Sequence, residues 1–138
     1  MNYNTIPGLD RQEITTQIMY AKKGFITSDY ILKKIAEYFI ADDGVQKTLL
    51  ALGYVPNKEG LIKAIKDKTR KREIIIARQA FCYFSKQLTN NTLKIIGKYL
   101  GQRDHSTVIH SIQVWDNLKQ VDSTVKQYDK QLKNIFGV

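Results

Sequence analysis

The sequence is poor in the features that mark secreted and membrane-spanning proteins. Its 138 residues contain a single cysteine, Cys82, so one chain cannot build a disulfide framework or a thiolate metal site. No run approaches the roughly 20 apolar residues of a membrane span, and the N-terminus lacks a charged-then-apolar signal pattern. These absences predict a cytoplasmic protein with one compact domain, or one domain with a helical extension, and a buried structural thiol.

Patterns typical of enzymes and metal sites are missing as well. The eight glycines are scattered, and none stands in the G-x-x-x-x-G-K-S/T arrangement that cradles a triphosphate. His105 and His110 are five residues apart, which is not a helix-neighbour spacing, and no carboxylate or thiol completes a metal shell around them. Asp104, His105 and Ser106 are the residue types of a hydrolytic triad, but three consecutive residues cannot form its hydrogen-bonded chain. We expect no enzyme activity, no cofactor and no metal.

Positive charge is in excess, and it is confined to one half of the chain. Residues 1–60 contain seven basic and seven acidic residues, whereas residues 61–138 contain fifteen basic and six acidic residues, so the second half holds the whole net charge of +9. Such an asymmetry is the electrostatic footprint of a module that neutralises phosphates. A solvated basic surface that only aids solubility is the alternative.

Hydrophobic spacing predicts helices throughout, and therefore an all-α fold. Three isoleucines at 74–76 could also begin a strand, but no partner strand is visible, so a helix is preferred. The last helix is expected to close the core over Trp115, with a dimer seam as the alternative. Six helices are predicted besides the motif described next. Three are located by their start, at Asp10, at the cap Ser28 and at Leu61. The other three span Val45 to Leu52, Ala77 to Leu88, and about Asp122 to Phe136.

The stretch 93–115 predicts two helices joined by a short glycine turn. Apolar residues recur at helical spacing on both sides of the turn: Leu93, Ile96, Leu100, Val108, Ile112 and Trp115. Gly101 stands where a left-handed residue ends a helix, and Asp104 can cap the second one. Groups able to contact base edges gather where that helix begins: Arg103, Asp104, His105, Ser106 and Thr107. Because a helix-turn-helix places this end in the major groove, the pattern predicts a DNA-binding motif.

The residues from Ile96-Gly97 through Val108 closely resemble the signature of the DNA-binding domain of DnaA, the bacterial chromosomal replication initiator family. That signature is Ile-Gly, two residues, an apolar residue, Gly, any residue, Arg or Lys, and then Asp-His-Ser/Thr-Thr-Val. The resemblance covers roughly Thr69 to Phe136, about half of the chain. The family usually has Ala where this chain has Ser111, which is a change of packing size.

The resemblance implies a helix-turn-helix domain over residues 61–138, with a fold also like that of the tryptophan repressor, behind a helical region, 1–60, of unknown role. The helix from Ile31 to Phe39 faintly resembles the one that precedes the DNA-binding domain in the family. If that likeness is real, residues 40–67 are an insertion. Otherwise residues 1–60 are an unrelated helical cap or a module that holds another replication or regulatory protein. The family's ATP-binding domain is absent from this sequence.

The resemblance further implies sequence-specific binding of double-stranded DNA at a short asymmetric box of the replication-origin type, in control of replication initiation and at the nucleoid. Arg103, Asp104, His105, Ser106 and Thr107 would lie in the major groove, although Asp104 could instead cap its helix. Arg78 would enter the minor groove, an ion pair or a phosphate contact being its alternative. The expected phosphate contacts are the basic loop, defined as Lys68 to Arg72 (Lys68, Arg70, Lys71 and Arg72), together with Lys86 and Lys94. A transcription regulator and a non-enzymatic interaction protein are alternative functions, and the oligomeric state is left open.

Overall fold

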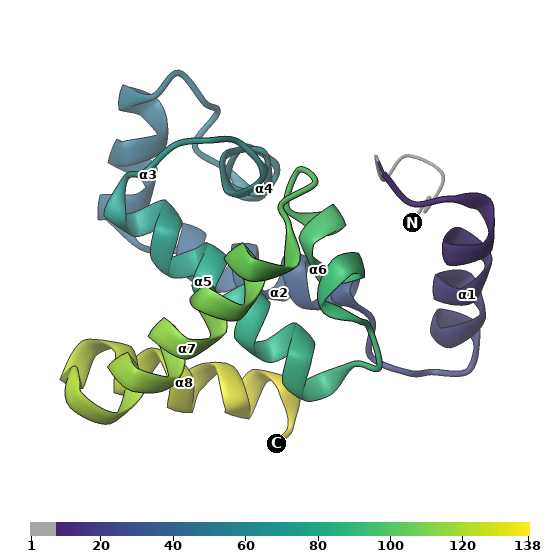
Figure 1. Ribbon diagram of the computed structural model, residues 1–138. Helices are drawn as coiled ribbons and strands as arrows, with labels where there is room; N and C mark the ends of the chain where they lie inside the picture. Colours follow the sequence, from purple (N-terminus) through teal and green to yellow (C-terminus); the bar gives the residue numbers. More distant parts are fainter. Residues whose placement is uncertain (1–7) are drawn as a thin grey trace.

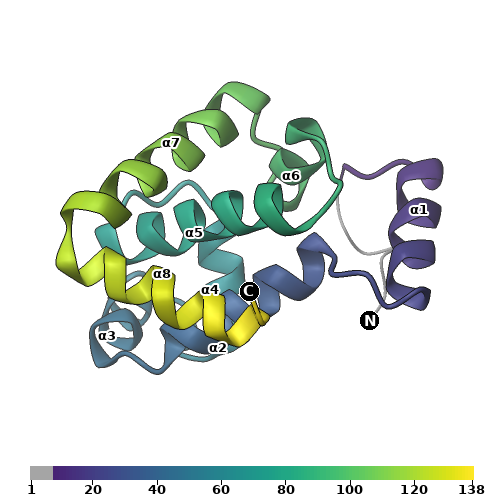
Figure 2. The same cartoon turned by 90° about the horizontal axis from the view of Figure 1, so that it is seen from below.

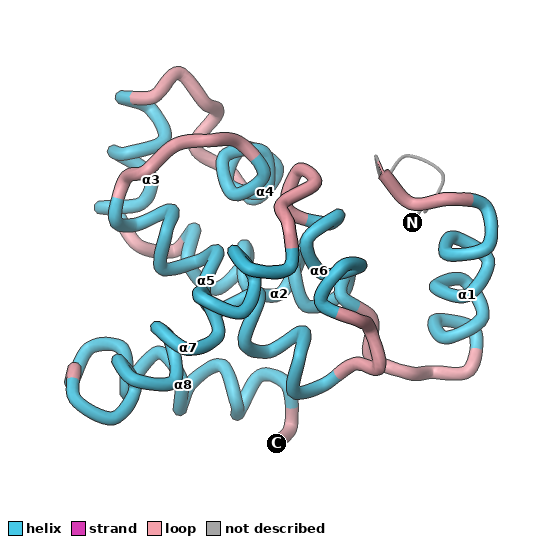
Figure 3. Tube along the Cα trace, in the orientation of Figure 1, coloured by secondary structure: helices cyan, strands magenta, loops and turns pink. Residues whose placement is uncertain are grey.

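The computed structural model describes residues 8–138, and residues 1–7 lie outside the described part. The described residues form helices joined by loops, with no strand among them (Figures 1 and 3). This confirms the predicted all-α class. The helices are α1 (Arg11–Lys22), α2 (Ser28–Ile40), α3 (Asp43–Ala51), α4 (Lys58–Lys66), α5 (Arg72–Leu88), α6 (Leu93–Tyr99), α7 (His105–Val121) and α8 (Ser123–Phe136).

Helix starts differ from the predicted ones where polar residues occupy the first turn. The cap of α2 is Thr27, whose hydroxyl accepts from the N–H of Tyr30, and Ser28 is the first helical residue. Helix α4 begins three residues before Leu61, behind an Asn57 cap. Helix α5 begins at Arg72 and takes in the three isoleucines. Apolar spacing locates the middle of a helix, so the first residue of a helix is set less accurately, by one to a few positions here.

One hydrophobic core runs through the molecule and crosses residue 60. Helix α5 lies at its centre and packs against α2, α3, α4, α6 and α7 (Figure 2). Ile31 and Ile35 of α2 and Leu49 of α3 are fully buried in the same cluster as Phe81 and Trp115. The apolar face of α2 is therefore used inside the fold and is not free to hold a partner.

The last helix closes the core over Trp115, as predicted. The indole Nε1 of Trp115 donates to Oδ1 of the buried Asp129 at 3.0 Å, and Lys133 pairs with the other carboxylate oxygen of Asp129 at 3.0 Å. Cys82 is fully buried behind these helices, and burial raises the pKa of its thiol to about 12. Among residues 8–138 no helix is long and apolar enough to cross a membrane.

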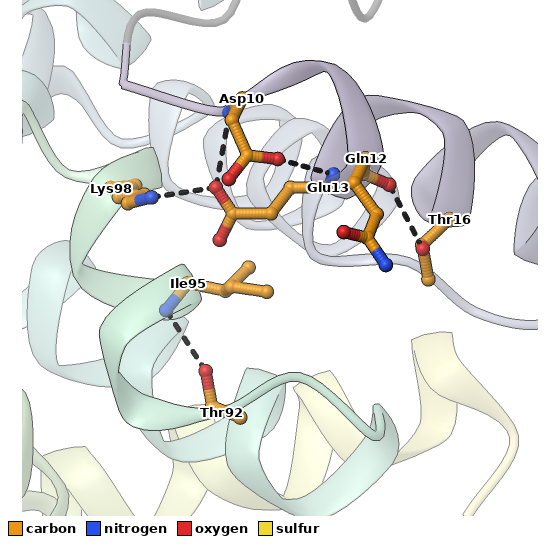
Figure 4. A network of polar contacts seen from close by, with 7 residues as sticks. All are labelled: Asp10, Gln12, Glu13, Thr16, Thr92, Ile95 and Lys98. Carbon is orange, nitrogen blue, oxygen red and sulfur yellow. Dashed lines mark hydrogen bonds and ion pairs between the residues drawn. The ribbon is translucent and has the colours of Figure 1, made fainter.

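Helix α1 lies at the edge of the bundle beside α6, where Ile14 and Ile18 pack against the core and polar contacts add to the attachment (Figures 2 and 4). Glu13 pairs with Lys98 of α6 at 2.6 Å. The fully buried Gln17 donates to the side chain of Asn91 at 2.8 Å, and Asn91 donates to the hydroxyl of Ser28 at 2.8 Å. Because buried polar groups are costly to leave unpaired, this network fixes how α1 sits beside α6.

Candidate nucleic-acid interface

Helices α6 and α7 form the predicted helix-turn-helix. Thr92 caps α6 by accepting from the N–H of Ile95 at 3.3 Å. Gly101 has a φ of +72° after the last residues of α6, which is the left-handed conformation expected for it. Asp104 caps α7 by accepting from the N–H of Thr107 at 2.9 Å. Both helices thus begin with a side-chain cap, and the turn is only a few residues long.

Two glycines allow the turn to pack closely. A Cβ on Gly97 would stand 2.0 Å from the carbonyl oxygen of Arg103, whose own N–H donates to the carbonyl of Gly97 at 2.9 Å. A Cβ on Gly101 would stand 2.3 Å from the carbonyl oxygen of Lys66 at the end of α4. Only hydrogen fits at these two positions. The turn is therefore pressed against both α6 and the C-terminal end of α4.

Four consecutive polar residues are exposed where α7 begins: Asp104, His105, Ser106 and Thr107. Val108, directly after them, is fully buried and anchors the helix. The hydrogen bond from the Thr107 N–H lowers the pKa of Asp104, which favours its carboxylate form. The prediction that Asp104 could cap α7 is confirmed. All four side chains are accessible to a base, as their predicted contacts require.

The basic loop lies on the surface after α4 and ends at Arg72, the first residue of α5, and all four of its basic residues are exposed. Arg72 is the only one of the four with an ion pair to a described residue, at 4.0 Å from Asp122. Lys86, in the last turn of α5, and Lys94, in the first turn of α6, are exposed too. The structure thus leaves all the lysines predicted to bind phosphates accessible.

Arg78 corrects the minor-groove prediction, because its side chain points into the protein. Only 8% of Arg78 is exposed. Its Nε donates to the carbonyl of Ile65 at 2.9 Å, its Nη2 to that of Asp67 at 3.0 Å, and its Nη1 to that of Thr69 at 3.3 Å. The last carbonyls of a helix have no intrahelical donor, and this guanidinium supplies one. Burial, and then the charge of Arg103, lower the pKa of Arg78 to about 10, so it stays charged at neutral pH.

Arg103, predicted to contact a base, donates instead to backbone carbonyls of the protein in this structure. It is half-buried, with Nη1 donating to the carbonyl of Leu100 at 2.5 Å and Nη2 to that of Asp67 at 2.6 Å. Burial lowers the pKa of Arg103. We call Arg78 and Arg103, which converge on the end of α4, the arginine clamp. One cue in the sequence points to it: no glycine follows α4, so its carbonyls need another donor.

Comparison with known proteins identifies the motif. Residues 61–114 match the family model described as "Bacterial dnaA protein helix-turn-helix". The chain is 29% identical over 117 residues to the chromosomal replication initiator protein DnaA of Flavobacterium psychrophilum, covering 85% of this chain and 20% of that protein. It is 33% identical over 97 residues to the DnaA protein of Streptococcus thermophilus, covering 67% of this chain and 21% of that protein. Over 73 residues it is 38% identical to the DnaA protein of Streptococcus mutans, 53% of this chain and 16% of that protein.

These matches cover more than half of this chain but only a small part of each relative. The chain spans about a fifth of the length of the DnaA proteins it matches. A match over 85% of the chain also reaches upstream of residue 61, into the helices that share the core with the motif. No solved structure matches the chain significantly. This chain therefore contains a helix-turn-helix domain of the bacterial DnaA family.

Proposed function

We propose that the chain binds double-stranded DNA in a sequence-specific way through its helix-turn-helix, at a short asymmetric site of the kind expected for a replication origin. One observation carries this proposal. Asp104, His105, Ser106 and Thr107 are exposed together at the amino end of the second helix of a DnaA-family motif. In a helix-turn-helix this end enters the major groove, so these four side chains are the base-contacting groups.

Each of the four offers different chemistry to a base edge. The carboxylate of Asp104 can accept from the amino group of cytosine while it caps the helix. The hydroxyls of Ser106 and Thr107 donate and accept, and the ring of His105 can contact a thymine methyl or donate to a phosphate. We assign the phosphate contacts to the basic loop, with Lys86 and Lys94 in support. Arg70, which is exposed and forms no ion pair within the described residues, is the loop guanidinium best able to reach a groove.

Selection of bound duplexes from a random pool tests the proposal directly. We expect a defined sequence to be enriched, and its affinity, followed by fluorescence anisotropy, to fall linearly on a log–log plot against salt with a slope of about 0.9 per phosphate contact. The double variant Lys68→Ala/Lys71→Ala should lose about two phosphate contacts and so lower that slope by about 1.8. Lys22→Ala/Lys23→Ala, at the C-terminal end of α1 and away from the loop, is the matched control with the same loss of charge. A chain that enriches no sequence and binds no duplex in dilute buffer refutes the proposal.

We further propose that the chain acts in the control of replication initiation, at the nucleoid. The support for this role is that the matched relatives are chromosomal replication initiator proteins. The selected sequence can be offered in competition to this chain and to the Flavobacterium psychrophilum protein. Shared preference supports action at initiator sites, whereas a selected sequence that the initiator ignores points to a transcription regulator.

A further inference from the structure

The arginine clamp joins three parts of the chain at one place. Arg78 comes from the middle of α5, and Arg103 comes from the turn between α6 and α7. Both donate to the carbonyl of Ile65, at 2.9 and 3.4 Å, and both donate to the carbonyl of Asp67, at 3.0 and 2.6 Å. Two guanidinium groups from separate elements therefore share their acceptors at the C-terminal end of α4.

Physical chemistry explains why two cations gather there. The unpaired carbonyls at the end of a helix carry partial negative charge, which offsets the repulsion between two guanidinium groups. A guanidinium holds five N–H groups in one plane and so can donate to several carbonyls at once. A lysine ammonium is a point charge on a flexible stem and does not reproduce this geometry.

The clamp also reaches both surfaces that the proposed function uses. Arg78 donates to the carbonyl of Thr69, which lies inside the basic loop, and Arg103 donates to that of Leu100, which begins the turn before α7. Asp67, directly before the loop, is held by both. The backbone of the loop and the backbone of the turn are thus tied to the same carbonyls.

We propose that Arg78 is a positioning residue for DNA binding: by holding the carbonyls of Asp67 and Thr69, it fixes the basic loop at a set distance from the start of α7. The phosphate-contacting and base-contacting groups then meet a duplex together, without the loop being ordered first. Arg78 acts through the loop and does not touch DNA. This inference rests on the proposed function.

A distance measurement tests the positioning without DNA. Lys68→Cys and Ser106→Cys, both at exposed positions, carry spin labels, and the buried Cys82 stays unlabelled. We expect a narrow distribution of label distances in the parent and a broad one in Arg78→Lys, with helicity unchanged by circular dichroism. Arg11→Lys, at an exposed position on α1, is the control and should keep the narrow distribution. Should Arg78→Lys fail to fold, Arg78→Gln, which keeps planar N–H donors, is measured in its place and should also give a broad distribution.

Binding of the selected duplex by the unlabelled chain tests the consequence. Arg78→Lys keeps the charge, so we expect affinity to fall by about 2- to 30-fold, the range of indirect couplings, while the salt slope stays constant. Native affinity with a native distance distribution would overturn the proposal. A native distribution with lost affinity would overturn it too, because Arg78 would then contact DNA. If the parent binds no duplex, the proposed function fails, and the distance distributions still decide whether Arg78 fixes the loop.

Discussion

Basic side chains of the C-terminal half occupy two contrasting environments in this molecule. Lys68, Arg70 and Lys71 of the basic loop are exposed to water, whereas Arg78 and Arg103 are turned inward onto the carbonyls that end α4. All five contribute equally to the charge excess of the C-terminal half. The difference teaches that basic residues in a sequence mark an exposed positive surface only where they are not needed as donors to the carbonyls at a helix end.

The two environments also differ in what a change would cost. An exposed lysine is hydrated in the free protein and contributes little to stability, so its removal should leave the fold intact. The clamp arginines donate to backbone carbonyls in place of water, and the loss of either one removes hydrogen bonds from a charged group. Substitutions at the two sets should therefore separate stability from DNA affinity.

The largest effect should come from breaking the turn that carries Arg103. Gly97→Ala places a Cβ against the Arg103 carbonyl, which is backbone and cannot move aside alone. We expect a loss of about 3 kcal/mol in the free energy of unfolding, the upper end for overpacked sites. Urea denaturation followed by circular dichroism measures it. Gly44→Ala, where the added Cβ meets only the flexible carboxylate of Asp42, is the control, and an equal loss there would contradict the argument.

A second experiment compares the two environments directly by removing one arginine from each. Arg78→Leu should lower the free energy of unfolding by about 2 kcal/mol, since several hydrogen bonds from a charged group are lost and the carbonyl of Thr69 loses the donor that Arg78 supplies. Arg70→Leu should change it by less than about 0.5 kcal/mol and should reduce the salt dependence of DNA binding. Both variants lose one charge, so net charge cannot explain a difference. Equal melting temperatures for the two variants would remove the distinction.

The features of the fold that could be predicted from sequence are those set by local chemistry. Gly101 is left-handed because it ends α6, Asp104 caps α7 because a carboxylate precedes an apolar repeat, and Trp115 is buried under α8. The buried pair Gln17 and Asn91 could not be predicted, because its partners are 74 residues apart and nothing local marks them.

The candidate site divides in the same way. The exposure of residues 104–107 follows from their place before the first buried residue of α7, so the sequence suffices. The place of the Arg103 guanidinium depends on Asp67, directly after α4 and 36 residues earlier in the chain. Resemblance to a family assigned DNA contacts to Arg78 and Arg103, but it gave no information on which backbone carbonyls surround them in the fold.

A third experiment asks which side chains at the turn select a sequence. His105→Ala should relax preference at one base pair, by about 1 to 2 kcal/mol, since it removes an exposed group in the groove. Arg103→Ala should instead weaken binding to all duplexes alike, because its guanidinium acts on the protein backbone. Affinities for the selected duplex and for its single-base variants measure both. Loss of preference at one base pair in Arg103→Ala would show that the guanidinium leaves the clamp on DNA.

The smallest effect is a pH dependence at Asp104, the exposed acid beside the half-buried Arg103. The bond from the Thr107 N–H lowers the pKa of Asp104 in the folded state. Its stabilising contribution is therefore present above the pKa of the unfolded carboxyl, about 3.9, and is lost as the pH falls through the lower folded-state value. Asp104→Asn keeps a capping group but does not titrate. The difference in melting temperature between the parent and Asp104→Asn should shrink as the pH falls from about 6 to about 2. A constant difference would mean that the charge of Asp104 adds nothing to the start of α7 beyond the capping hydrogen bond.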